Sequence, residues 1–244
     1  MRNLISVLSF CFVFTAALCA QAPEGKLQHI LKEHKKSLGD QTALEKIKSM
    51  KMTGVISILG EESEIKIFRR LPNKCRIEFK HEGEDVVCYY DGSQAWMKTA
   101  KGDTAVDDPV IYAALLAMSK FDILSGHKSH GVQVKYLGKD EFEGKPVYKL
   151  QLNYKDEEDE EWFLDQSTFR LLKAGGKTLY YGSSKSDKTI LYMDYEPVEG
   201  VYLPHYFFCD ITTFNSEIEI EKIELNPQLD PGFFKAAHSL IPRD

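Results

Sequence analysis

The chain has 244 residues, enough for one large domain or two small ones with a buried core. Hydrophobic residues make up 43% and charged residues 28%, which excludes a disordered or collagen-like chain. The formal net charge is -6, whereas a protein that binds nucleic acid by neutralising phosphates normally carries a basic excess.

The N-terminal segment is typical of a secretory signal peptide. Arg2 gives a basic start, an almost entirely apolar run follows from Leu4 to Leu18, and small residues come next. The apolar run is shorter than the roughly 20 residues that a membrane-spanning helix needs. We expect cleavage after Ala20, with cleavage after Ala22 as the alternative. The mature chain, residues 21–244, is then exported.

Cys19 allows a second interpretation of this segment, a lipid anchor of the bacterial lipoprotein type. The residue before a lipidated cysteine is normally small, and here it is Leu18, so a soluble mature protein is favoured. Beyond Cys11 and Cys19 the chain has three cysteines, an odd number without Cys-x-x-Cys spacing. That pattern favours neither a disulfide framework nor a zinc site.

Two stretches follow a helical pattern. In residues 24–49, with a break at Gly39-Asp40, positions recur every three or four residues: Leu27, Ile30, Leu31, His34, Leu38, Ala43, Leu44 and Ile47. In residues 108–124 an apolar helical pattern begins at Asp108-Pro109, a typical start signal. Both stretches are predicted to be helices.

The rest of the mature chain alternates with a period of two and is predicted to form about ten or eleven strands. Tight turns such as Glu82-Gly83, Asp91-Gly92 and Glu143-Gly144 separate them. This order predicts a mainly β (α+β) protein, an unclosed and highly curved antiparallel β-barrel with helices covering its concave face. Alternating βαβ units are absent, which disfavours a nucleotide-binding parallel sheet. We expect a single domain.

The sequence carries no motif of a known catalytic or metal site. Gly-x-Ser-x-Gly, His-Glu-x-x-His, P-loop and Gly-x-Gly-x-x-Gly patterns are absent. The acidic run 156–161 lacks the layout of a calcium loop and is predicted to be a solvated hairpin turn. His127 and His130 flank a turn, where a surface loop is favoured over a metal site. We expect no catalytic residues, no metal and no cofactor; an enzyme acting on a lipid or glycan is the least favoured alternative.

Five turn-and-strand segments stand out in chain order: Arg69-Arg70-Leu71-Pro72-Asn73 with Arg76-Ile77-Glu78, Tyr90-Asp91-Gly92 to Trp96, Leu137-Gly138-Lys139 to Lys149-Leu150, Glu199-Gly200-Val201-Tyr202-Leu203-Pro204, and Glu221 to Leu229 with Phe234. Together they resemble the periplasmic lipoprotein-carrier family of the LolA/LppX type. Each segment alone is a turn with its flanking strands, and the match covers most of residues 40–236.

The resemblance implies an unclosed β-barrel with a helical lid over an apolar cavity. It implies a periplasmic, monomeric carrier that moves lipid or lipoprotein acyl chains towards the outer membrane and has an envelope protein as a further partner. In the lipoprotein carriers an arginine directly before the Pro-Asn pair holds the lid. Here Leu71 takes that place and Arg70 lies one residue earlier, so Arg70 is the candidate lid contact.

A carrier of acyl chains needs an apolar cavity, because each buried methylene group contributes about 0.8 kcal/mol. The candidate lining consists of apolar residues on alternating strand positions and on the second helix: Ile67, Ile77, Phe79, Tyr90, Trp96, Ile111, Leu115, Met118, Phe121, Tyr148, Leu150, Leu152 and Phe163. The alternative is that these side chains fill the core. A filled core would favour a non-catalytic cell-envelope interaction protein on the same scaffold.

Cys75 and Cys88 flank the Glu82-Gly83 turn. If Phe79 pairs with Glu84, Cys75 lies opposite Cys88 on the core face. The two cysteines are then either two buried thiols or a cross-strand disulfide of an oxidising compartment. Cys209 is left over and is expected to be buried.

Overall fold

The computed structural model describes residues 24–99, 102–120, 124, 126–128, 131–154, 159–181, 184–211 and 214–235. Several sequence predictions lie outside these residues: the signal peptide at 1–20, the anchor at Cys19, the cavity residue Phe121, His130, and residues 156–158 of the acidic run. No helix in the described ranges is long and apolar enough to cross a bilayer.

Thirteen strands form one antiparallel sheet. Their bounds are β1 Ser49–Ile58, β2 Glu61–Arg70, β3 Lys74–His81, β4 Glu84–Tyr90, β5 Ala95–Thr99, β6 Gly102–Ala105, β7 Gln133–Phe142, β8 Lys145–Asn153, β9 Glu160–Asp165, β10 Leu171–Tyr181, β11 Ser184–Val198, β12 Val201–Ile211 and β13 Phe214–Leu225. The predicted count was too low. The short strand β6 has no alternating apolar pattern, so its sequence gives no strand signal.

The sheet consists of two meanders that meet in its centre. The order across the sheet is β6-β5-β4-β3-β2-β1-β13-β12-β11-β10-β9-β8-β7. The chain therefore moves outward from β1 to one edge, crosses to the opposite edge, and returns to β13 beside β1. The crossing connection between β6 and β7 contains α3 (Pro109–Ser119), which begins at the predicted start signal. Topology thus requires α3 to cross a face of the sheet.

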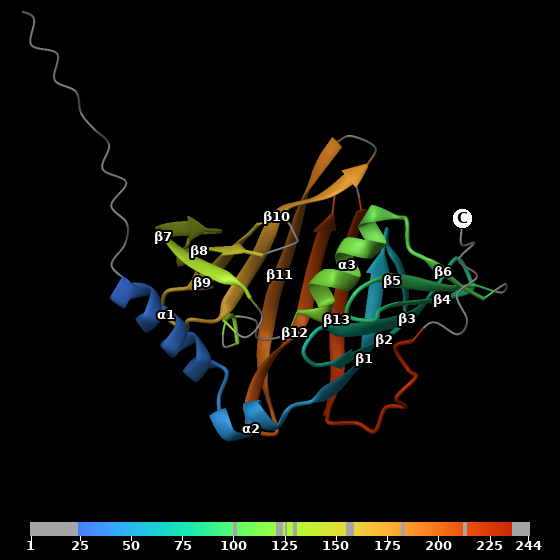
Figure 1. Ribbon diagram of the computed structural model, residues 1–244, viewed down its shortest axis with the longest axis horizontal. Coiled ribbons are helices and arrows are strands. Elements are labelled where there is room, and N and C mark those ends of the chain that lie inside the picture. The colour runs from blue at the N-terminus through green and yellow to red at the C-terminus, as the bar shows by residue number, and fades with distance from the viewer. Residues whose placement is uncertain are drawn as a thin grey trace, which may run out of the picture.

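The sheet curves around α3. The helix contacts β3 and β4 of the first meander and β10 and β12 of the second (Figure 1). Asp108 caps α3, since its carboxylate accepts hydrogen bonds from the backbone N–H groups of Val110 and Ile111. Leu115 and Met118 of α3 are almost fully buried in the largest of three apolar clusters among the described residues.

Two further helices replace the predicted helix at 24–49, with the expected break between them. They are α1 (Glu24–Ser37), which contacts β7, and α2 (Gln41–Lys46), which contacts β12. The residue between them, Gly39, has a φ of 100°, and a side chain there would collide with the carbonyl oxygen of Gly200. The chain can therefore turn closely over β12 only with glycine at this position.

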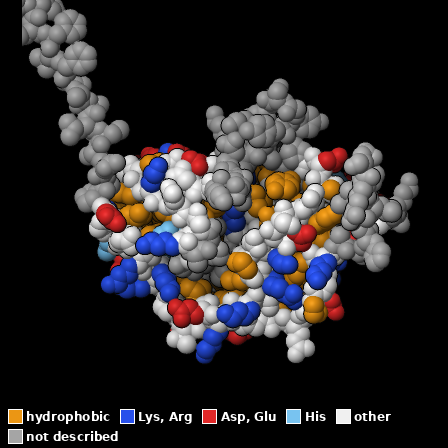
Figure 2. Space-filling model, viewed as in Figure 1, with side chains coloured by type: hydrophobic (Ala, Val, Ile, Leu, Met, Phe, Trp, Pro, Cys, Tyr) orange, Lys and Arg blue, Asp and Glu red, His pale blue; other side chains and the backbone are white. Residues whose placement is uncertain are grey.

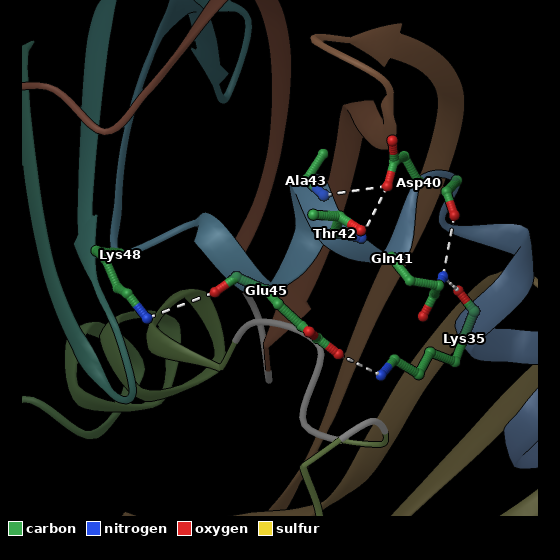
Figure 3. Close-up of polar contacts among 8 residues, drawn as sticks. Lys35, Asp40, Gln41, Thr42, Ala43, Glu45 and Lys48 are labelled. Carbon is green, nitrogen blue, oxygen red and sulfur yellow. Dashed lines mark hydrogen bonds and ion pairs between the residues drawn. The ribbon is translucent and has the colours of Figure 1, made fainter.

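Polar contacts fix the junction of α1 and α2 (Figure 3). The carboxylate of Asp40 accepts hydrogen bonds from the backbone N–H groups of Thr42 and Ala43, which caps α2. Lys35 and Glu45 form an ion pair between the two helices with an N–O distance of 3.1 Å. The junction holds α1 over the second meander, where Ile30 packs into the second of the three apolar clusters.

Candidate functional site

A small cavity lies in the interior where the two meanders, α1 and the end of α3 meet. Its volume is about 60 Å³. That is room for a few water molecules or a small anion, and far below the roughly 300–1,000 Å³ of common ligand sites. Figure 2 shows hydrophobic side chains gathered around a hollow on the face that carries α3. The lining is His34, Leu38, Met50, Met52, Arg69, Lys120, Trp162, Leu171, Tyr192, Tyr195, Tyr202, Leu203, Pro204 and Phe207.

Arg69 is the most unusual residue of this lining. It lies near the end of β2 on the inner face and is only 6% exposed. Its Nη2 donates to the thioether sulfur of Met118 at 3.4 Å, a weak acceptor, and its buried Nε has no hydrogen-bond partner among the described residues. No Asp or Glu of the described ranges forms an ion pair with it. Burial lowers the pKa of Arg69, but an arginine stays protonated in proteins.

A second group of buried charges centres on Glu160, the first residue of β9. Its Oε1 accepts from Lys188 Nζ at 2.6 Å and from Lys120 Nζ at 3.1 Å. Its Oε2 accepts from the hydroxyl of Tyr154 and the indole N–H of Trp162, each at 3.0 Å. Burial alone would raise the pKa of Glu160, but the two lysines outweigh it, and the pKa lies well below its usual range. This carboxylate is therefore charged and fully hydrogen-bonded.

His34 of α1 forms part of the same wall. It is 3% exposed, and its Nδ1 donates to the carbonyl oxygen of Phe169 at 2.7 Å. Burial lowers the pKa of His34, more than the hydrogen bond raises it. The imidazole is therefore neutral at pH 7. Of the charged side chains that line the cavity, both Arg69 and Lys120 are positive.

The sequence matches no known family model and no curated protein. The structure is similar to a LolA superfamily protein from Nitrosomonas europaea, with a TM-score of 0.59 and 13% identity over 86% of this chain and 97% of that chain. It is also similar to a putative outer membrane lipoprotein-sorting protein domain from Vibrio parahaemolyticus. The TM-score is 0.54, and the match has 13% identity and covers 86% of this chain and 95% of that chain. This chain has a LolA-like fold. The predicted fold class, an open and curved antiparallel sheet with a helix on its concave face, is confirmed.

Two of the sequence motifs that resemble the LolA/LppX family, the Pro-Asn turn and the Asp-Gly turn, stabilise the turns between strands by side-chain hydrogen bonds. Asp91 accepts from the backbone N–H groups of Ser93 and Gln94 and, at 3.0 Å, from the indole N–H of Trp96. The side chain of Asn73 donates to the carbonyl oxygen of Gly92, which ties the Pro-Asn turn to the Asp-Gly turn. Asn73, Asp91 and Trp96 thus position the turns of the sheet and lie outside the cavity lining, whereas other motif residues belong to it: Arg69, Tyr202, Leu203 and Pro204.

None of the described residues that the sequence proposes as cavity lining borders this cavity. Seven of them pack in the apolar cluster between α3 and the sheet: Ile67, Ile77, Phe79, Tyr90, Ile111, Leu115 and Met118. Three pack in the second cluster, near α1: Tyr148, Leu150 and Leu152. Their role as the wall of an opened cavity stays a prediction.

Two of the proposed lining residues lie on the outer face of the sheet. Trp96 pairs with Tyr89, and its neighbour Ala95 is the residue that faces the core under α3. Phe163 pairs with Lys149, and its ring contacts Phe142 on the outside of β7. The prediction was wrong for Trp96 and Phe163 because both faces of this sheet carry aromatic residues.

Arg70, the candidate lid contact, lies against the segment after β13 in this structure. The guanidinium of Arg70 donates to the carbonyl oxygen of Leu229 at 2.8 Å and lies over the ring of Phe234. It therefore holds the segment after β13 on the outer face. The contact with the helix α3 comes from Arg69, because alternation along β2 points that side chain inward.

The proposed pairing of Cys75 with Cys88 is also wrong. Glu82 and Gly83 form a two-residue turn with positive φ, so His81 pairs with Glu84 and Phe79 with Val86. Cys75 then pairs with Tyr90, and Cys88 with Ile77. Both are free, buried thiols, as is Cys209.

The prediction for the acidic run was wrong at Glu160, which is 2% exposed rather than solvated. The sequence offered a signal: Glu160 is two residues before Trp162 and so shares its inward face in a strand. Lys120 and Lys188 were missed because their partner is distant in sequence. The burial of Arg69 could have been read from its alternation with Ile65 and Ile67.

Proposed function

We propose that this protein is a non-catalytic carrier that binds the acyl chain of a lipid or lipoprotein between α3 and the concave face of the sheet. Export through the signal peptide at residues 1–20, a periplasmic location and transfer towards the outer membrane belong to the same proposal. The observation that carries it is the apolar contact between α3 and the sheet.

This contact is of a kind that an acyl chain can replace. The helix α3 buries Ala113, Leu115, Leu116 and Met118 against apolar side chains of both meanders. Apolar contacts are non-directional, so a hydrocarbon chain could take the place of the helix against these apolar side chains. Among the described polar groups of the sheet, Nη2 of Arg69 would then lose its present partner, Met118. Each methylene that an acyl chain buries there would contribute about 0.8 kcal/mol.

Binding requires α3 to move, since the cavity of about 60 Å³ is too small for an acyl chain. When α3 leaves the sheet, side chains such as Ile67 and Ile77 become the wall of an enlarged cavity. The sequence-based lining would then apply to this open state.

The comparisons support the same proposal. One similar structure is a LolA superfamily protein, and the other is named as an outer membrane lipoprotein-sorting domain. Those names describe the two neighbours. For this chain, the arrangement of α3 on an apolar concave face supports a related role in handling lipid.

Native mass spectrometry of the mature protein, purified from a bacterial periplasm under mild conditions, tests the carrier proposal. We expect an additional mass that matches a phospholipid or an acylated peptide and that is lost on denaturation. A clean ligand-free mass, together with no binding of a fluorescent fatty-acid analogue, would contradict the proposal.

A second candidate function is an interaction protein of the cell envelope on the same scaffold. The observation that favours it is the nearly filled space between α3 and the sheet. In that case α3 stays in place when amphiphiles are added, and the ligand-free mass is the expected result.

A further inference from the structure

Arg69 gives the interior an unbalanced positive charge. The residue is 6% exposed and borders the cavity, and among the described residues the hydrogen-bond partner of its guanidinium is the sulfur of Met118. Its Nε is buried and unpaired. A buried charge without a counter-ion is costly in an apolar interior. The position therefore costs stability unless a further group binds there.

The neighbouring charges do not supply that group. The described carboxylate inside this region is Glu160, and its oxygens accept from Lys188, Lys120, Tyr154 and Trp162. Arg69 lies next to Cys75 across β2 and β3 and near Tyr192. Burial raises the pKa of the Cys75 thiol to about 12 and also raises the pKa of Tyr192, so both are neutral at pH 7.

We propose that the cavity receives the anionic head group of the cargo, a carboxylate or a phosphate, with Arg69 as its counter-ion. Guanidinium is suited to this role because its planar fork can donate two parallel hydrogen bonds to either group. The inference rests on the carrier function proposed above and narrows its cargo to anionic amphiphiles.

Two features of the site fit a head group rather than a whole lipid. The volume of about 60 Å³ suits a small anion. Met118, the present partner of Arg69, belongs to α3, so displacement of α3 would release Nη2 for the anion. An acyl chain attached to that anion would then extend along the apolar surface that α3 covers. Head group and chain would thus occupy adjoining parts of one site.

The test compares amphiphiles that share a sixteen-carbon chain and differ in the head group. The probes are palmitate, palmitoyl lysophosphatidic acid and the neutral monopalmitoyl glycerol, with acetate and inorganic phosphate as chain-free anions. Binding of the amphiphiles is measured by displacement of a fluorescent fatty-acid analogue in the full mature chain, and binding of acetate and inorganic phosphate is measured directly by isothermal titration calorimetry. We expect the wild type to bind an anionic amphiphile at least about tenfold more tightly than the neutral one. Comparing palmitate with the lysophosphatidic acid distinguishes carboxylate from phosphate.

Substitutions of Arg69 test whether this residue causes the preference for anionic over neutral amphiphiles. In Arg69→Met we expect the anionic amphiphiles to bind about tenfold to a hundredfold more weakly, down to the level of the neutral one. Arg69→Lys should restore part of the preference because it keeps the charge. Arg70→Met is the matched control, since it removes the neighbouring arginine from the outer face and should leave the preference intact.

Each other outcome overturns the inference in a distinct way. Equal binding of neutral and anionic amphiphiles refutes the head-group site and leaves the carrier function standing. A preference that survives in Arg69→Met refutes the role of Arg69. Binding of acetate or phosphate with no binding of any amphiphile refutes the carrier function and leaves an anion site alone. No binding of any probe refutes both.

A measurement on the wild type keeps the inference testable if Arg69→Met does not fold. Palmitate labelled with ¹³C at its carboxyl carbon reports its own ionisation by chemical shift. Beside Arg69 the pKa of the bound carboxyl should lie below that of palmitate in neutral vesicles. A value equal to or above that in vesicles would overturn the proposal, because an apolar site without a counter-ion raises the pKa of a carboxyl group.

Discussion

Buried cations occur in two different settings in this protein. Lys188 is 1% exposed at its side chain and shares the carboxylate of Glu160 with Lys120. Arg69 is buried to a similar degree and has a thioether as its partner. The first setting is complete within the chain, so it contributes to folding. The second is incomplete, so it is the one that a ligand can complete. The two settings therefore differ in the counter-ion and not in the burial of the charge.

The largest expected change in stability comes from removing the carboxylate charge that Lys188 and Lys120 share. Glu160→Gln removes the charge that Lys188 and Lys120 share, so both buried lysines lose this counter-ion. We expect the free energy of unfolding to fall by about 3–5 kcal/mol, measured by denaturant unfolding at pH 7. Glu161→Gln is the control, since that side chain is 47% exposed and pairs with Lys149 on the surface. It should change stability by less than about 0.5 kcal/mol.

Removal of the cation that lacks a carboxylate partner, Arg69, is expected to change the free energy of unfolding in the opposite direction. Arg69→Met removes a charge that has no counter-ion among the described residues. We expect its free energy of unfolding to be unchanged or raised, by up to about 1–4 kcal/mol. A loss as large as that of Glu160→Gln would contradict the comparison, because it would show that Arg69 is balanced within the chain.

A smaller effect is expected when one of the two lysines is removed. Lys188→Met takes away the shorter of the two contacts to Glu160, while Lys120 keeps the carboxylate paired. We expect a loss of about 1–3 kcal/mol, below that of Glu160→Gln in the same assay. If Lys188→Met costs more than Glu160→Gln, the carboxylate is not the common centre of the group.

The smallest effect concerns pH. The pKa of His34 is lowered by burial from its ordinary value of 6.5, so the unfolded chain binds the proton more readily than the folded chain does. The stability that His34 contributes is complete above pH 6.5 and falls as the pH drops below that value, by at most about 1.4 kcal/mol per pH unit. His34→Gln should flatten the pH dependence between about 4.5 and 6.5, above the range in which Glu160 titrates.

His29→Gln provides the control for the pH prediction, because His29 is an exposed residue of the same helix. The free energy of unfolding of His29→Gln should depend on pH between 4.5 and 6.5 as that of the wild type does. If His34→Gln also matches the wild type, another group carries the pH dependence of stability.

The fold was more predictable from the sequence than the site was. Period-two alternation located most strands, and the Asp108-Pro109 signal placed the start of α3, because both depend on local patterns. The site depends on register and on contacts between distant residues. Glu160 meets Lys188 through strand pairing and Lys120 through the crossing helix, and neither contact has a local signature. Trp96 and Phe163 show the same limit, since alternation does not reveal which face is concave.

The most direct test of the carrier account is a distance measurement on α3. Tyr112 of α3 is 37% exposed, and Leu59 at the β1–β2 turn is 81% exposed. Spin labels on Tyr112→Cys and Leu59→Cys should react selectively, since burial raises the pKa of Cys75, Cys88 and Cys209 to about 12 and shields these thiols.

Double electron–electron resonance would then give the distance between the two labels with and without palmitate, with native mass spectrometry confirming occupancy in the same samples. The account predicts a new distance population when palmitate is bound, because α3 has to leave the sheet to admit the chain. An unchanged distance distribution in palmitate-loaded protein would contradict it.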